Sequence, residues 1–108
     1  MEVATFTDAN FDEEVLGAPV PVLVDFWAEH CVPCRTQARA LSRLATELGP
    51  RAKVGRLDVD GNPRTTEAFR VRGVPHLALV AGGRVVLELV GGYPLERLRE
   101  RVRPWLGD

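Results

Sequence analysis

The sequence has few cysteines and no long apolar stretch. Its 108 residues include only two cysteines, Cys31 and Cys34. Two cysteines this close together enclose too short a loop to restrain an unfolded chain, and they cannot form the disulfide framework of a small secreted protein. The longest apolar runs, such as 19–24 and 77–81, are too short to span a bilayer, so no membrane partner is predicted. The cysteine pair therefore points to chemistry.

The first twenty residues contain no lysine or arginine. A signal peptide needs a positively charged start followed by an apolar stretch, so none is predicted and the expected location is cytoplasmic. The 14 basic and 15 acidic residues leave a formal net charge of −1, which argues against nucleic acid as a partner. The length predicts a single domain over residues 1–108, and the small size and neutral surface favour a monomer.

Turn signals divide the chain into alternating strand and helix patterns. The expected strands are 3–6, 21–28, 52–59, 76–81 and 84–90, and the expected helices are 9–16, 33–48, 64–69 and one from Leu95 to near Pro104. Asp8 or Thr7 is expected to cap the first helix, and Asn62 the third. Early strands separated by helices pair in parallel, whereas the late hairpin adds antiparallel strands. The predicted fold class is α/β, with a central mixed five-stranded sheet and four helices on both of its faces.

The two cysteines lie where the strand 21–28 gives way to the longest helix. At this helix N-terminus, unpaired N–H groups and the helix dipole stabilise a thiolate on Cys31. Cys34 lies one turn further on, where it is expected to be more buried and suited to resolving a mixed disulfide. A C-x-x-C pair at a strand-to-helix junction indicates redox chemistry, although zinc sites share the bare motif and two buried cysteines can also be simple core residues.

Asp25 is the one charged residue in the apolar run 22–27. A carboxylate in a buried strand is costly to ionise, so its pKa should rise, and such residues are candidates for function. Two interpretations stay open. Asp25 either accepts the proton of the Cys34 thiol during resolution, or it is a strand-end carboxylate bonded to backbone.

Residues 24–35, Val-Asp-Phe-Trp-Ala-Glu-His-Cys-Val-Pro-Cys-Arg, resemble the active-site segment of the thioredoxin family. The segments 57–63, 71–75, 82–83 and 90–92 match later signatures of that family, so the resemblance covers nearly the whole chain. It implies the thioredoxin fold and a protein dithiol–disulfide oxidoreductase that reduces disulfides in other proteins. It also implies no cofactor beyond the cysteine pair, and an NADPH-dependent flavoprotein thioredoxin reductase as a partner.

The resemblance implies roles for individual residues. Cys31 matches the attacking cysteine, Cys34 the resolving cysteine and Asp25 the buried aspartate. Pro75 matches a proline preceded by a cis peptide bond, beside which the backbone of Val74 would pair with the substrate chain as an added strand. The other implied substrate-binding residues are Trp27, His30, Val32, Pro33, His76 and Gly91.

The sequence departs from the family pattern beside the cysteines, with His30 in place of tryptophan, Val32 in place of glycine and His76 in place of threonine. Both histidines are expected at the rim of the site. An imidazolium near Cys31 would favour the thiolate and make the couple more oxidising, so a less reducing oxidase-like or isomerase-like variant stays open. Arg56 replaces a lysine that the family often has near the aspartate, and a solvated strand end is an equally open interpretation.

Two alternatives come from other classes of protein. Cys31, Cys34, His30 and His76 would make a zinc set, but the adjacent His30 and Cys31 suit tetrahedral geometry poorly, so no metal is predicted. A redox-inactive binding or chaperone module that keeps the pair incidentally is the other alternative.

Overall fold

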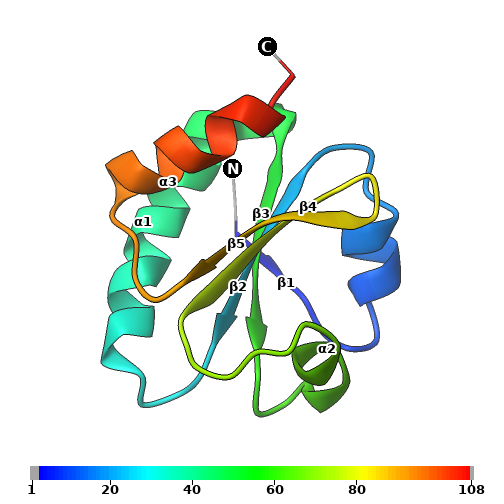
Figure 1. Cartoon of the computed structure of the whole chain (residues 1–108), viewed down its shortest axis with the longest axis vertical. Helices are drawn as coiled ribbons and strands as arrows, with labels where there is room; N and C mark the ends of the chain where they lie inside the picture. Colours follow the sequence, from blue (N-terminus) through cyan, green and yellow to red (C-terminus); the bar gives the residue numbers. More distant parts are fainter. Residues whose placement is uncertain (1–2, 108) are drawn as a thin grey trace.

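The computed structural model describes residues 3–107 and contains a mixed sheet with the strand order β1-β3-β2-β4-β5 (Figure 1). The strands are β1 (Ala4–Thr5), β2 (Val22–Trp27), β3 (Lys53–Asp58), β4 (His76–Ala81) and β5 (Arg84–Val90). Strands β1, β2 and β3 pair in parallel, and β4 runs antiparallel to both β2 and β5. The predicted five-stranded α/β sheet is confirmed.

Helices cover both faces of this sheet (Figure 1). Helices α1 (Val32–Leu48) and α3 (Leu95–Val102) lie side by side on one face, and α2 (Pro63–Ala68) and the π-helix η1 (Asp12–Leu16) lie on the other. Two short 3-10 helices, η2 (Gly49–Arg51) and η3 (Arg103–Trp105), follow α1 and α3. The first helix is expected over 9–16, and in the structure η1 is shorter, covering Asp12–Leu16. Within the described residues, no helix combines the length and the apolar character needed to cross a membrane.

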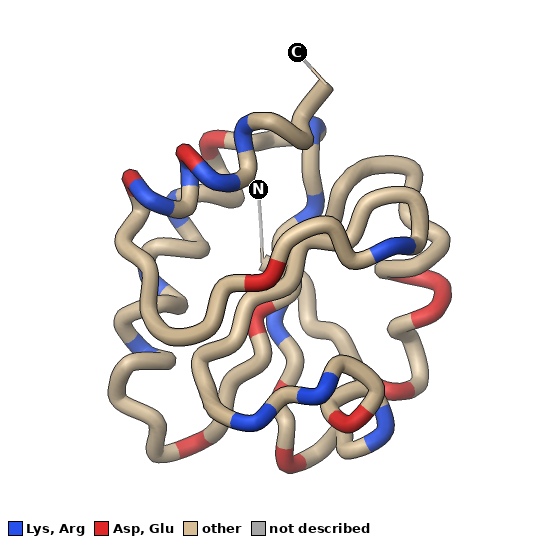
Figure 2. The backbone as a smooth tube through the Cα atoms, in the orientation of Figure 1, with Lys and Arg blue, Asp and Glu red and all other residues tan. Residues whose placement is uncertain are grey.

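An ion pair joins the two helices of the α1 face. The guanidinium of Arg99 on α3 donates from Nε and Nη2 to the two carboxylate oxygens of Glu47 on α1, each at 2.8 Å. This hydrogen bond lowers the pKa of Glu47 and raises that of Arg99. Elsewhere too, acidic and basic residues are interspersed along the backbone (Figure 2).

The cap of α2 comes from a distant part of the chain. The side chain of Asn62 makes no capping hydrogen bond, contrary to the prediction. Instead the carboxylate of Asp8 accepts hydrogen bonds from the N–H groups of Arg64 and Thr65, at 3.1 and 2.8 Å, and Asn62 Oδ1 accepts one from Asp8 N–H at 2.8 Å. These bonds fix the segment before η1 to the start of α2.

Alternation along β2 decides which residues face the cysteines. Leu23 packs with the α1 and α3 layer, whereas Val24 and Phe26 pack with the η1 and α2 layer. Since successive side chains of a strand point to opposite faces, Asp25 shares the face of Leu23. The buried strand therefore carries one carboxyl group into the layer beneath α1.

Glycine is required at two places in the fold, on β3 and in the turn between β4 and β5. A Cβ atom on Gly55 of β3 would overlap the ring of Phe6, so only glycine lets this ring reach the core. The turn Gly82-Gly83 has φ angles of 61° and 79°, which glycine adopts without strain. The hairpin predicted at this dipeptide is confirmed.

Candidate active site

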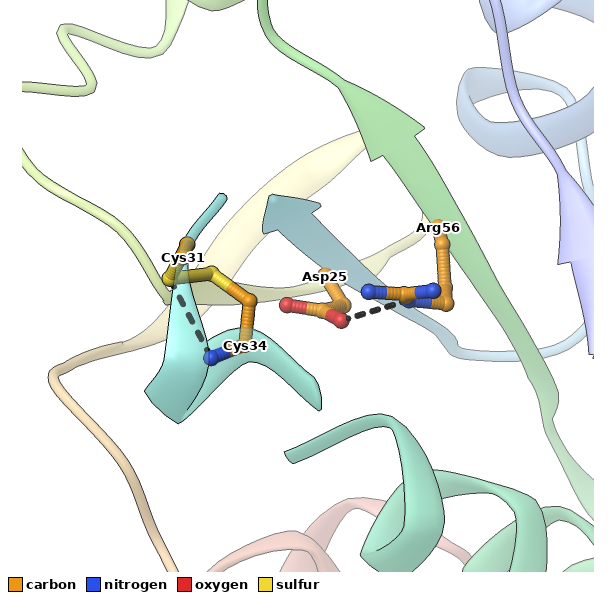
Figure 3. The surroundings of a disulfide bond; sticks show 4 residues. All are labelled: Asp25, Cys31, Cys34 and Arg56. Carbon is orange, nitrogen blue, oxygen red and sulfur yellow. Dashed lines mark hydrogen bonds and ion pairs between the residues drawn. A yellow bond between two sulfur atoms is a disulfide. The ribbon is translucent and has the colours of Figure 1, made fainter. Parts of the chain in front are cut away.

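Cys31 and Cys34 are joined by a disulfide at the N-terminal end of α1 (Figure 3). Cys31 is the residue before the helix, and its Sγ accepts a hydrogen bond from the Cys34 N–H at 3.1 Å. Pro33 fits here because the first turn of a helix needs no N–H donor. Cys31 is half-buried and Cys34 is only 1% exposed. An incoming disulfide can therefore reach Cys31 before Cys34.

Asp25 lies between this disulfide and Arg56 (Figure 3). One of its carboxylate oxygens contacts Arg56, and the other is directed toward Cys34. Its Oδ2 accepts a hydrogen bond from Arg56 Nε at 2.9 Å, and its buried Oδ1 has no hydrogen-bond partner among the described residues. Burial raises the pKa of Asp25, and the hydrogen bond and charge of Arg56 act in the opposite direction. The expected rise is confirmed. A buried acid with one free oxygen beside a thiol is suited to proton exchange.

Arg56 is part of the site and not a solvated strand end. It stands directly beside Asp25 in the parallel register of β2 and β3. Its guanidinium carbon lies 4.7 Å from the centre of the Trp27 ring, and its side chain is 26% exposed. The cation thus lies against an aromatic ring and a carboxylate, which holds a permanent charge next to the acid.

The prediction that both histidines lie at the rim is wrong for His76. His76 is 6% exposed, packs its ring edge-to-face against Phe26 with centroids 5.7 Å apart, and places Nε2 3.0 Å from Glu88 Oε2. It pairs with Phe26 across β2 and β4, so it shares the face opposite to Asp25. His30, in contrast, is exposed, directly precedes Cys31 and has a φ of 67°.

Two of the other predicted substrate-binding segments, those of Pro75 and Gly91, meet where β4 begins and β5 ends. The Val74–Pro75 peptide bond is cis. The Pro75 carbonyl accepts a hydrogen bond from Gly91 N–H at 2.9 Å, which joins the start of β4 to the segment after β5. Val32 is 66% exposed and Pro33 is also exposed, so the residues between the two cysteines form an apolar surface.

Sequence reasoning missed two polar residues with tertiary roles. Gln37 is buried in α1 and bonds to the backbone of Tyr93. Its position one turn before the buried Leu41 was an available signal, because a polar residue on an apolar helix stripe needs a partner. The side chain of Glu88, the partner of His76, is 47% exposed. A charged residue that stays in contact with solvent does not need a buried partner, so no sequence pattern indicates this pair.

The four residues of the alternative zinc site do not come together. The cysteines are bonded to one another, and His76 points to the opposite face of the sheet. Over residues 3–107, no group of three or more His, Cys, Asp or Glu side chains is arranged to hold a metal ion.

Comparisons with known proteins match most of the chain. The family model described as Thioredoxin matches residues 2–104. A thioredoxin of Rhodospirillum rubrum is 45% identical over 96 residues, which cover 89% of this chain and 92% of the relative. Thioredoxins of Alicyclobacillus acidocaldarius and Haemophilus influenzae are 44% and 39% identical, over 91% and 90% of this chain and 92% and 91% of each relative.

Proposed function

This chain belongs to the thioredoxin family and is a thiol–disulfide oxidoreductase, and we propose that it reduces disulfides in other proteins through Cys31 and Cys34. The asymmetry of the pair carries the proposal. Cys31 is reachable at the start of α1, whereas Cys34 is buried on the side of Asp25. One cysteine is thus suited to meet the substrate and the other to release it.

The first step needs a thiolate on Cys31. In the reduced protein, the N-terminal end of α1 and the Cys34 N–H favour this thiolate, and the first turn of the helix carries no acidic residue. The Cys31 thiolate attacks one sulfur of the substrate disulfide. A mixed disulfide forms, and the other substrate sulfur leaves as a thiolate that takes a proton from solvent.

The second step uses Cys34 and Asp25. Since Arg56 occupies Oδ2, the free Oδ1 accepts the proton of the Cys34 thiol. The Cys34 thiolate attacks Cys31 Sγ, the mixed disulfide breaks, and the second substrate sulfur leaves as a thiolate that takes a proton from solvent, while Asp25 releases its proton to solvent. Two electrons pass from the protein dithiol to the substrate disulfide, and the protein ends as the Cys31–Cys34 disulfide.

The proposal extends to the partners. The backbone of Val74, beside the cis bond to Pro75, would pair with the substrate chain as an added strand. Trp27 and Gly91 would line the substrate groove. An NADPH-dependent flavoprotein thioredoxin reductase would return the pair to the dithiol, and the protein would use no redox group other than this pair.

The test is reduction of a protein disulfide by the pre-reduced protein, and then with NADPH and a bacterial thioredoxin reductase. We expect turnover by the unmodified chain and a loss of at least about a thousandfold in Cys31→Ser, because serine is a far weaker nucleophile. Cys34→Ser should instead accumulate a mixed disulfide at Cys31. Full activity of Cys31→Ser would overturn the proposal.

A less reducing, oxidase-like thioredoxin is the second candidate function. It requires imidazolium charge near the cysteines, from His30, His76 or both. Because His76 faces away from the cysteines, the exposed His30 is the remaining source of this effect.

A further inference from the structure

Gln37 is a buried polar residue on the inner side of α1. It is 2% exposed, and it shares this side with buried apolar residues such as Cys34 and Leu41. Its Nε2 donates to the Tyr93 carbonyl at 2.9 Å, and its Oε1 accepts from the Tyr93 N–H at 2.8 Å. One carboxamide therefore satisfies both backbone groups of a residue 56 positions away.

These two bonds fix the segment that follows β5. Gly91 has a φ of +93°, a conformation that few residues other than glycine adopt, and Gly92 follows it. The Pro75 carbonyl holds the Gly91 N–H, and Gln37 holds Tyr93. Both ends of a glycine-rich turn are thus tied to the elements that carry the active site.

A groove of about 360 Å³ lies between α1 and this segment. Besides Gln37, it is lined by Pro33, Thr36, Ala40, Gly92, Tyr93 and Pro94. None of these side chains is charged, and the Gln37 carboxamide is already engaged by Tyr93. The groove therefore suits an apolar group better than a polar one.

The groove is continuous with the reacting centre through Pro33. This residue stands between the two cysteines and is exposed, as is its apolar neighbour Val32. A polypeptide bonded to Cys31 that runs along Pro33 reaches the groove within a few residues of its own cysteine. Exposed apolar surface beside a nucleophile favours a partner that presents apolar side chains there.

We propose that this groove is a specificity subsite that receives one apolar side chain, of leucine or methionine size, from the protein substrate. Gln37 is a positioning residue, because it holds the Tyr93 wall of the groove in place. The proposal rests on the disulfide reductase function above and adds to it a preference for an apolar residue a few positions from the substrate cysteine.

The experiment uses two disulfide peptides that are identical except for leucine or serine at positions two to four residues from the reactive cysteine. Single-turnover reduction by the pre-reduced protein gives a limiting rate and a half-saturating concentration for each peptide. Each rate is divided by that of the same protein with a small aromatic disulfide, which is too short to reach the groove. We expect a leucine preference of about tenfold.

Two groove variants test the geometry, with Val85→Ala as a matched control at an exposed apolar residue elsewhere. Ala40→Met fills the groove and should bring the leucine preference close to one. Gln37→Leu frees the Tyr93 wall and should raise the half-saturating concentration of the leucine peptide alone, with little change in its limiting rate. Val85→Ala should keep the preference.

Equal reduction of both peptides by the unmodified protein overturns the subsite and leaves the reductase function standing. The subsite also fails if Ala40→Met keeps the preference, or if Gln37→Leu lowers the thermal midpoint without altering half-saturation by the leucine peptide. If the unmodified protein reduces neither the peptides nor the small disulfide, the reductase function itself is wrong.

Discussion

Asp25 on β2 and His76 on β4 lie on neighbouring antiparallel strands, one register step apart, yet they face opposite sides of the sheet. Each is buried, and each is paired with one residue from the next strand outward. Arg56 Nε is 2.9 Å from Asp25 Oδ2, and Glu88 Oε2 is 3.0 Å from His76 Nε2. The two pairs have similar geometry but different surroundings.

The surroundings are the reason that the proposed mechanism gives a chemical role to Asp25 and not to His76. Asp25 keeps one oxygen without a partner and directs it toward Cys34, with the permanent cation of Arg56 behind it. His76 packs against Phe26, and its partner Glu88 is 47% exposed. Burial and charge pairing alone would therefore not have singled out Asp25 for the proposed mechanism, because His76 has both. A free polar atom beside the reacting atoms is the feature that separates the two.

The largest expected effect is that of Asp25→Asn. An amide cannot accept the Cys34 proton, so resolution of the mixed disulfide should slow by about a hundredfold at neutral pH. Gel analysis of the mixed disulfide with a protein substrate measures this rate, and Glu88→Gln is the matched control on the other pair. A resolution rate unchanged in Asp25→Asn would remove Asp25 from the mechanism.

Asp25→Asn should slow resolution, but it should also stabilise the folded protein at neutral pH. Because burial raises the folded pKa of Asp25, the carboxyl stabilises the fold below its unfolded pKa of about 3.9, and this contribution is lost as the pH rises through the folded pKa. Asp25→Asn should therefore be more stable than the unmodified protein at neutral pH, with a gap that narrows on acidification. Urea unfolding across this range measures it, and a gap that widens on acidification would contradict the sign.

The next effect is that of Arg56→Met. Loss of the cation raises the pKa of Asp25 further, so less carboxylate is present at neutral pH and resolution should slow by roughly tenfold. The pH at which resolution is half-maximal should move upward. Arg56→Lys keeps the charge and should recover most of the rate. An unshifted pH profile in Arg56→Met would show that the pair does not tune the acid.

A smaller effect is expected for His30→Trp. Loss of an exposed side chain that can carry positive charge beside Cys31 should shift the thiol–disulfide equilibrium with glutathione by about threefold toward a more reducing couple. The equilibrium constant with glutathione measures the change. An identical constant for the variant would leave the less reducing variant without support.

The smallest effect on the chemistry is expected for His76→Thr. Since His76 faces away from the cysteines, the glutathione equilibrium should not change, whereas loss of the partly buried hydrogen bond to Glu88 should lower the free energy of unfolding by about 1 kcal/mol. Glu88→Gln, which changes the other residue of the same pair, serves as the control variant for both measurements. A redox shift in His76→Thr as large as that in His30→Trp would mean that the two faces of the sheet are electrostatically coupled.

Local patterns in the sequence were enough to place the cysteine pair. An apolar strand pattern ends before Cys31, and a helical pattern that tolerates Pro33 begins after it, so the pair had to stand at a helix N-terminus. Asp25 was found for a similar reason, because a single carboxylate in an apolar strand has no local partner. Strand period and helix period act over a few residues, and these features depend on nothing more.

The face occupied by His76 could not be predicted in the same way. Strand β4 is apolar on both faces, so alternation along the sequence does not reveal which residues look toward α1. The same limit applies to the cap of α2, which Asp8 supplies from a segment far from the helix in sequence. In each case the deciding contact joins residues from different elements.

The sequence by itself determined the order of the main strands and helices, the cysteine pair at the start of α1 and the presence of a buried acid near that pair. Only the tertiary structure decided the partners. Strand register brought Arg56 to Asp25, and packing of the segment after β5 against α1 brought Tyr93 to Gln37. The physical reason is that hydrophobic period and turn chemistry are local properties of the chain. Hydrogen bonds across strands and layers depend instead on how the finished elements are placed.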